Sequence, residues 1–255
     1  MATPRALIFS GFGLNCEYET QLAFELAGGQ ADIVHLNTLI ANPSVLQRYQ
    51  IAVFPGGFSY GDDVGSGKAY GRRVARHLRE TLDAFIARDT LVLGICNGFQ
   101  ILTNTGLLPG ALTANDSARY VCRWVDVAVN SASPWLAGLS QLPLPIAHGE
   151  GKYYDTAENL AALEAHGQLA LTYTAGEMSR HFSLPANPNG SLQNIAGVTS
   201  IDGRVLGMMP HPERGMLFTQ LPHWTTLRQE YRDKKMALPK YAAGLQIFRN
   251  AIKAF

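Results

Sequence analysis

Cys96 is the residue in this 255-residue sequence that is best placed to do covalent chemistry. It follows an apolar run, residues 91–95, whose length and β-branched content predict a buried parallel strand. The apolar pattern behind it, residues 97–102, suits a helix. Gly94 and Gly98 stand two residues before and two residues after the cysteine, where small residues let the chain turn tightly. This spacing predicts a nucleophile elbow with cysteine as the nucleophile.

A helix that begins directly after Cys96 would favour the reactive thiolate. Its free N–H groups and the positive end of its dipole would point at the sulfur. The same segment also fits a structural cysteine at a glycine-lined strand end, so this motif alone leaves both interpretations open.

A cysteine nucleophile needs a base, and His211 is the best candidate among the seven histidines. Pro212 biases His211 toward an extended backbone, in which residues two apart share a face. Glu213 can therefore lie beside the imidazole and fix its tautomer, which is the third role in a catalytic triad. His148 is the competitor, with Glu150 two residues away, but the glycines around it leave it poorly held for catalysis.

Gly56 and Gly57 follow the expected strand 51–54, at the edge where open α/β sheets build their sites. Two glycines there would expose backbone N–H groups, which an oxyanion hole needs, although a plain strand-to-helix turn explains them equally well. Two other glycine-rich segments, residues 11–16 and 62–69, lack positions that dinucleotide and phosphate loops require, so nucleotide binding is not expected. No Cys/His spacing supports a zinc site, and no metal is expected.

Alternating patterns in the first half of the chain define the elements that position these residues. Strands are expected at residues 6–10, 32–36, 51–54 and 91–95, and helices at residues 17–26, 43–49 and 68–88. Strands separated by helices imply right-handed crossovers and a mainly parallel sheet that is covered on both faces. We therefore expect an α/β protein, a three-layer sandwich around that sheet.

The second half of the chain has a different pattern of expected strands and helices. We expect a strand of antiparallel type at 120–129, a loop with three prolines at 131–145, a helix at 159–166, a strand at 169–174, a hairpin of 195–200 with 205–209, and a closing helix at 241–254. No linker-like change in composition and no internal repeat divides the sequence. A single domain over residues 1–255 is expected.

The composition is that of an ordinary globular protein, with 47% hydrophobic residues, 16% charged residues and a net charge of +1. The small net charge gives no reason to expect nucleic acid or an anionic membrane as a partner. Three widely spaced cysteines argue against a disulfide framework. The first residues lack an apolar signal core, and no apolar run approaches the roughly 18 residues of a membrane span. A soluble, cytoplasmic protein is expected.

Several motifs together resemble the class I, triad-type glutamine amidotransferases. The segments that carry this resemblance are GICNGFQ at residues 94–100 and PHPE at residues 210–213. Four more segments are similar to the glutaminase component of phosphoribosylformylglycinamidine synthase: GGFSYGD at 56–62, IAHGEG at 146–151, NPNGS at 187–191 and MMPHPER at 208–214. That enzyme carries out a glutamine-dependent amination in purine synthesis. The resemblance covers the chain from the first strand to the closing helix and implies a flavodoxin-like sandwich with a nucleophile elbow.

The resemblance also implies a role for each matching residue. Cys96 would be the nucleophile, His211 the general base and acid, and Glu213 the partner that orients the imidazole. The backbone N–H groups of Gly57 and Asn97 would form the oxyanion hole. Glutamine would then be hydrolysed through a γ-glutamyl thioester on the cysteine.

Gln100, one turn into the elbow helix, would help to hold the substrate glutamine. The product ammonia is mostly protonated in neutral water and is then no longer a nucleophile, so the glutaminase must hand it directly to another active site. The sequence has no recognisable ATP-binding loop and implies no cofactor in this chain. The resemblance implies a synthetase partner that uses ATP and Mg, in some systems joined by a small bridging subunit.

One segment departs from the pattern of the stand-alone glutaminase subunits, which often carry an arginine soon after the Gly61–Asp62 pair. Here residues 64–67 are VGSG, which resembles the version fused to a large single-chain synthase, and residues 218–238 are expected to be an extra surface segment. Whether the partner is a separate chain therefore stays open. Two rival classes fit less well, because γ-glutamyl hydrolases commonly lack the blocks at 57–60 and 187–191, and a non-enzymatic scaffold would be expected to have lost a triad residue.

Overall fold

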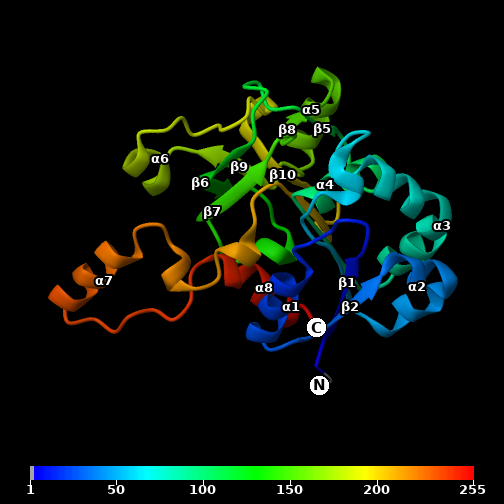
Figure 1. Cartoon of the computed structure of the whole chain (residues 1–255), viewed down its shortest axis with the longest axis horizontal. Coiled ribbons are helices and arrows are strands. Elements are labelled where there is room, and N and C mark those ends of the chain that lie inside the picture. The colour runs from blue at the N-terminus through cyan, green and yellow to red at the C-terminus, as the bar shows by residue number, and fades with distance from the viewer. Residues whose placement is uncertain (1–2) are drawn as a thin grey trace.

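Nine strands form a central mixed sheet in the computed structural model, which describes residues 3–255 (Figure 1). The strands of this sheet are β1 (Arg5–Ser10), β2 (Gln30–His35), β3 (Ile51–Phe54), β4 (Leu91–Ile95), β6 (Val121–Val129), β7 (Gln141–His148), β9 (Leu171–Thr174), β10 (Ile195–Thr199) and β11 (Val205–Met208). Two short strands, β5 (Ala111–Thr113) and β8 (Lys152–Tyr154), pair separately. The prediction that the first residues lack an apolar signal core includes residues 1–2. These two residues lie outside the described residues.

The sheet has a parallel half and an antiparallel half. Its strand order is β2-β1-β3-β4-β11-β10-β9-β6-β7. The strands from β2 to β11 pair in parallel, whereas β11 to β7 pair in antiparallel fashion. The parallel strands β3, β4 and β11 are buried throughout, as expected for strands covered on both faces.

Helices cover both faces of the parallel half, which confirms the predicted three-layer α/β sandwich. The helices are α1 (Glu17–Leu26), α2 (Leu36–Ala41), α3 (Lys68–Ile86), α4 (Asn97–Thr105), α5 (Ala157–Ala165), α6 (Glu177–Phe182), α7 (Trp224–Asp233) and α8 (Gly244–Lys253). The chain moves from β1 to β2 in one direction along the sheet and from β3 to β4 in the other. Right-handed crossovers therefore place α1 and α3 on opposite faces. Helix α8 packs with α1, and α4 packs with α3.

The prediction of a loop over residues 131–145 was wrong, because β7 begins at Gln141. Pro143 and Pro145 argued against a strand here, because proline has no N–H to donate to a sheet ladder. Strand β7 is the edge of the sheet and pairs only with β6 within the sheet. The carbonyl of Pro145 accepts a hydrogen bond from outside the sheet, so its backbone faces away from β6, where a missing N–H costs nothing.

The extra surface segment contains helix α7, which the sequence pattern did not predict as a helix. None of its side chains is buried, and the helix extends away from the sheet, at the lower left of Figure 1. Helices α2 and α6, both short, were also not predicted. Within residues 3–255 no helix has the length and apolar character needed to cross a membrane.

The elbow region depends on two glycines that contact neighbouring backbone. A Cβ atom added at Gly98 would lie 1.8 Å from the carbonyl oxygen of Phe54, at the end of β3. A Cβ atom added at Gly94 would lie 2.7 Å from the carbonyl oxygen of Gly98. The spacing of these glycines around Cys96 therefore reflects how closely α4 packs on the strands.

We expect Gly98→Ala to destabilise the protein by about 3 kcal/mol, because the new methyl group meets rigid backbone rather than a flexible side chain. Urea denaturation followed by circular dichroism measures this change in the free energy of unfolding. The matched control is Gly149→Ala, whose added Cβ would lie 3.9 Å from its nearest neighbour, Tyr120. The control should change stability by less than about 1 kcal/mol. Equal stability of the two variants would contradict the packing account.

Candidate active site

Cys96 is the single residue between β4 and α4, and its backbone conformation is rare for residues other than glycine. Its backbone has φ 51° and ψ −105°, and the residue is 5% exposed. Two backbone hydrogen bonds hold the turn: the Cys96 N–H donates to the Met208 carbonyl over 2.8 Å, and the Gln100 N–H donates to the Cys96 carbonyl over 3.1 Å. A non-glycine residue at positive φ is strained, and such strain gathers at functional sites. The predicted elbow is therefore present in the fold.

His211 and Glu213 form a buried pair beside this turn. The distance between His211 Nδ1 and Glu213 Oε1 is 2.6 Å, and the two residues are 2% and 0% exposed. The local sequence produces this geometry, because Pro212 begins a short 3-10 turn that brings residue 213 back beside the imidazole. Glu213 therefore lies beside the imidazole as predicted, but through a 3-10 turn after His211 rather than through the extended chain that the prediction assumed.

The charges around His211 favour its protonated form. Burial alone would lower the pKa of His211, but the Glu213 carboxylate and the nearby Cys96 sulfur outweigh it and raise that pKa well above the usual value. The Nε2 atom of His211 is buried and has no hydrogen-bond partner among the described residues. In this structure the Cys96 thiol donates to the carbonyl of Ala147 over 3.6 Å. An imidazolium stabilised beside a thiol is the arrangement that cysteine hydrolases use.

Cys16 is a second cysteine in this cluster, and the sequence analysis missed it. The residue is 1% exposed, and its sulfur, the His211 ring and the Glu213 carboxylate offer atoms that all lie within 4.8 Å of one another. Burial raises the pKa of the Cys16 thiol. One signal was available, since Cys16 follows β1, and the carboxyl ends of neighbouring parallel strands meet at one edge.

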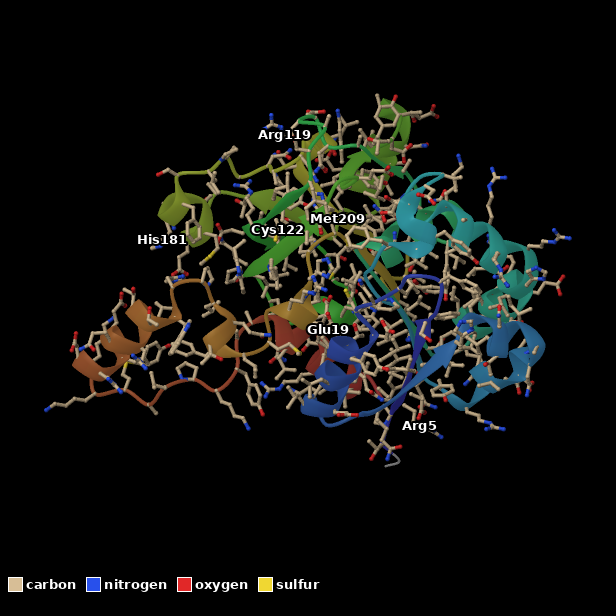
Figure 2. The ribbon with its side chains drawn as sticks, viewed as in Figure 1. Arg5, Glu19, Arg119, Cys122, His181 and Met209 are labelled. Atoms are coloured by element: carbon tan, nitrogen blue, oxygen red, sulfur yellow. The ribbon has the colours of Figure 1, made fainter. Side chains whose placement is uncertain are left out.

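Arg214 holds Cys16 from the outer side. Its Nη2 atom donates to the Cys16 sulfur over 3.0 Å and pairs with Glu19 over 3.1 Å. Figure 2 labels Glu19, which lies on α1. Cysteine, histidine and glutamate are donors that zinc accepts, but here a guanidinium lies against the sulfur and the carboxylate already binds the imidazole. The cluster is better described as a wall of the site that fixes the base.

The segments that carry Gly57 and Asn97, the two predicted oxyanion donors, are tied together by the Asn97 side chain. Its Oδ1 accepts from the Ser59 N–H over 3.2 Å, and its Nδ2 donates to Asp62 over 3.3 Å. Gly57 has φ 151°, and a Cβ atom there would lie 2.6 Å from the Gly13 carbonyl. The elbow and the loop after β3 therefore form one hydrogen-bonded unit, and the oxyanion role of their N–H groups stays a prediction.

Gln100 is 3% exposed and has both ends of its amide paired within the protein. Its Oε1 accepts from Asn97 over 2.8 Å, and its Nε2 donates to the Glu150 carbonyl over 2.5 Å. The residue connects the elbow helix to the loop around residue 150. Its predicted contact with substrate stays untested.

His148, the competing base, is placed differently from the sequence expectation. Its Nδ1 lies 3.1 Å from Asn115 Oδ1 rather than beside Glu150, whose carboxylate accepts from the Ser66 N–H. Burial and the charge of His211 lower the pKa of His148 to about 4. A group with that pKa is a poor base at neutral pH, so His211 is the better candidate.

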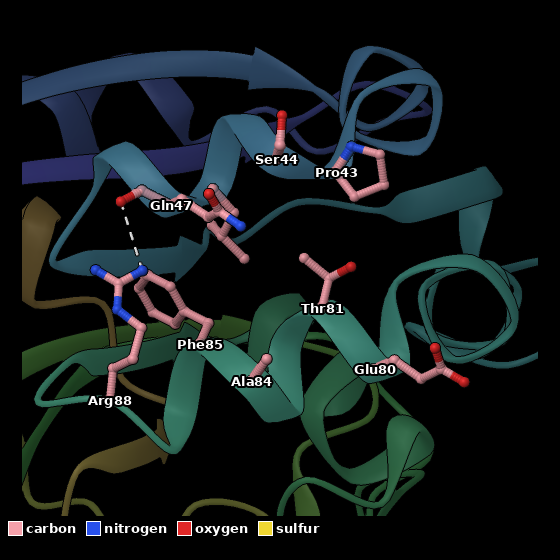
Figure 3. Close-up of a pocket in the computed structure, with 9 residues that line it drawn as sticks. Pro43, Ser44, Gln47, Glu80, Thr81, Ala84, Phe85 and Arg88 are labelled. Atoms are coloured by element: carbon pink, nitrogen blue, oxygen red, sulfur yellow. Dashed lines mark hydrogen bonds between the residues drawn. The ribbon is translucent and has the colours of Figure 1, made fainter.

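A cavity of about 640 Å³ lies away from this cluster. It lies between α3 and the turn Pro43–Arg48, and its lining includes Ser44, Glu80 and Arg88 (Figure 3). None of the triad residues lines it. The candidate site is therefore defined by the cluster at the elbow rather than by this hollow.

Comparison with known proteins shows the family of this chain. A family described as "CobB/CobQ-like glutamine amidotransferase domain" matches residues 3–255. The chain is 42% identical over 265 residues to "Phosphoribosylformylglycinamidine synthase subunit PurQ" of Methanococcus maripaludis strain C5, with 99% of this chain and 98% of the relative covered. The chain belongs to the PurQ family of glutamine amidotransferases. A PurQ subunit of Dehalococcoides mccartyi is 41% identical with the same coverage.

The solved structure of PurLQS from Thermotoga maritima contains a chain that is similar throughout. The TM-score is 0.74 at 29% sequence identity, and 99% of each chain is covered. A glutamine amidotransferase from Thermotoga maritima, at 15% identity and a TM-score of 0.53, shares the fold alone, with 99% of this chain and 97% of that chain covered. This agreement extends to the antiparallel half of the sheet, because the matched regions span the whole chain.

We expect Glu213→Gln to lower the pKa of His211, because the variant removes the anion that favours the imidazolium while burial still opposes it. Titration of the histidine ring by NMR measures this pKa, and the spectrum of His211→Asn assigns the signal. Glu19→Gln is the matched control, since it removes an acid that contacts Arg214 instead. An unchanged pKa in Glu213→Gln would contradict the assigned pair.

Proposed function

We propose that this chain is the glutaminase component of a phosphoribosylformylglycinamidine synthase. It hydrolyses glutamine to glutamate and ammonia and delivers the ammonia to a synthetase partner, which converts formylglycinamide ribonucleotide to formylglycinamidine ribonucleotide. The observation that carries the proposal is the strained Cys96 elbow beside the buried His211–Glu213 pair. The match to PurQ subunits over the whole chain supports the specific reaction. We propose that residues 1–255 form one amidotransferase domain.

The first chemical step joins the sulfur to the substrate. His211 takes the proton of Cys96, and the Glu213 carboxylate stabilises the resulting imidazolium. The thiolate then attacks the carboxamide carbon of glutamine, and the electrons of the C=O bond move onto oxygen. Backbone N–H groups of Gly57 and Asn97 stabilise that oxyanion, and the helix that begins at Asn97 adds the positive end of its dipole.

The second step releases ammonia and then glutamate. The tetrahedral intermediate collapses as the His211 imidazolium gives its proton to the leaving nitrogen, so neutral ammonia departs and a γ-glutamyl thioester remains. His211 next takes a proton from water, and the hydroxide adds to the thioester carbon. Collapse of the second intermediate breaks the C–S bond, and the returning proton restores the thiol.

The ammonia must reach an acceptor before water protonates it, which requires a partner with its own active site. We infer an ATP-dependent synthetase subunit, which uses Mg, and a small bridging subunit of the kind found in some systems. The similarity to a chain of PurLQS supports such an assembly. Loops 149–153 and 187–191 are our candidates for the mouth of the site, since Asn189 donates to the Gly151 carbonyl over 2.7 Å and Gln100 reaches the Glu150 carbonyl.

We expect Cys96→Ala to abolish glutamine-dependent synthesis in the complex with the synthetase, while added ammonia still supports it. The variant removes the nucleophile but leaves the acceptor site intact. Formation of the amidine product with each nitrogen source measures the effect. Cys122→Ala is the matched control, since Cys122 is exposed and lies outside the cluster. Unchanged use of glutamine by Cys96→Ala would exclude the mechanism.

We expect His211→Asn to slow formation of the thioester at neutral pH by about 100-fold or more, because the thiol loses its base. Rapid mixing with labelled glutamine, followed by acid quenching, measures that rate. His166→Asn serves as the control, since this histidine is exposed on the surface. A normal rate in His211→Asn would assign the base elsewhere.

A further inference from the structure

His148 carries a buried nitrogen that has no hydrogen-bond partner among the described residues. The residue ends β7 and is 2% exposed, and its Nε2 atom is buried. A buried polar atom left without a partner destabilises the folded protein, because it has lost its hydrogen bonds to water. An unpartnered buried atom of this kind calls for a partner that the described residues do not supply.

The state of this nitrogen follows from the hydrogen bonds of Asn115. The Nδ2 atom of Asn115 donates to the backbone carbonyls of Arg119 and His148, each over 2.9 Å. Its Oδ1 accepts from the Gly151 N–H over 3.1 Å. These three backbone groups fix the orientation of the amide, so the Oδ1 that faces His148 Nδ1 is an acceptor. Nδ1 must therefore carry the proton, and Nε2 is a bare lone pair.

The backbone around His148 contacts both members of the nucleophile–base pair. The carbonyl of Pro145 accepts from the His211 N–H over 2.8 Å, and the carbonyl of Ala147 faces the Cys96 sulfur at 3.6 Å. The charge of His211 also acts on the His148 ring, which together with burial lowers the pKa of His148 to about 4. The ring therefore stays neutral at the pH where the enzyme would operate.

We propose that Nε2 of His148 accepts an N–H of the substrate carboxamide and then of the departing ammonia, which makes His148 a specificity-determining residue for the amide over the carboxylate. This inference rests on the proposed glutaminase function. A primary amide offers two N–H donors at its nitrogen, whereas the glutamate carboxylate offers only lone pairs there. A lone pair on the protein binds the first and repels the second, so the product glutamate is released.

The Nε2 atom of His148 is also suited to bind the departing ammonia. After His211 has protonated the leaving nitrogen, neutral ammonia needs an acceptor that will not give it a further proton. A ring that carries no proton at Nε2 binds ammonia without converting it to ammonium. His211 is thus the only residue that gives a proton to the leaving nitrogen.

The test compares two substrates that differ only at the leaving group: glutamine and the γ-methyl ester of glutamate. The thiolate attacks the same carbonyl carbon in both, but the leaving oxygen of the ester has no N–H to donate. In the full chain assembled with the synthetase, His148→Phe should lower kcat/KM for glutamine by about 30-fold or more and change that for the ester by less than about threefold. Parallel losses on both substrates would overturn the proposal and leave His148 a structural residue.

A second measurement does not require any variant of His148. In the Cys96→Ala protein, the ¹⁵N resonance of His148 Nε2 should be that of an unprotonated nitrogen, and it should shift when glutamine is added but not when glutamate is added. A protonated Nε2, or a resonance that glutamine at saturation leaves unmoved, would overturn the proposal. Failure of the proposed function is distinguishable, because the wild-type complex would then hydrolyse neither substrate through Cys96.

Discussion

The positive φ of Cys96 is the backbone constraint on which the site depends. A non-glycine residue in such a conformation costs about 1–3 kcal/mol, so the surrounding structure must hold it. The holding contacts are buried: β4 is covered on both faces, Gly98 lies against the Phe54 carbonyl, and the Met208 carbonyl accepts the Cys96 N–H. The turn lifts the sulfur out of the strand and brings the N-terminus of α4 close to it. The same backbone turn therefore causes both the strain at Cys96 and the reactivity of its sulfur.

The antiparallel half of the sheet contributes contacts to the active site, whose nucleophile and base follow strands of the parallel half. Strand β7 is an edge of the sheet, yet its end reaches Cys96 and His211, which follow the carboxyl ends of the parallel strands β4 and β11. The outward carbonyls of residues 145 and 147 contact the base and the nucleophile. An edge strand with free carbonyls offers such contacts, and the prolines that remove N–H groups also protect this edge from pairing with another chain.

The sequence predicted the parts of the site that are encoded locally. The elbow was readable from Gly94 and Gly98, and the pairing of His211 with Glu213 from the proline between them. The parallel half of the fold followed from its alternating pattern, and the antiparallel character of β6 from its β-branched alternation. These features depend on residues that are close together in the chain.

Features that depend on distant contacts were missed. Cys16 joins the cluster because β1 lies two strands from β4 in the sheet, and the tautomer of His148 depends on Asn115, 33 residues earlier. No local pattern marks Asn115, and the signal for Cys16 is its position after β1, at the carboxyl edge of the parallel strands. Strand β7 was missed because proline argues against a central strand, and only the sheet order reveals that β7 is an edge. Helix α7 lacks a buried face, which is the signal that periodicity detects.

Trapping of the covalent intermediate tests directly whether Cys96 is the nucleophile. The wild-type complex is mixed with glutamine labelled in its carbon chain and quenched in acid, and the peptides are examined by mass spectrometry. We expect one γ-glutamyl group, attached through a thioester to the peptide that contains Cys96. Release of glutamate without label on this peptide, or with label on another residue, would contradict it.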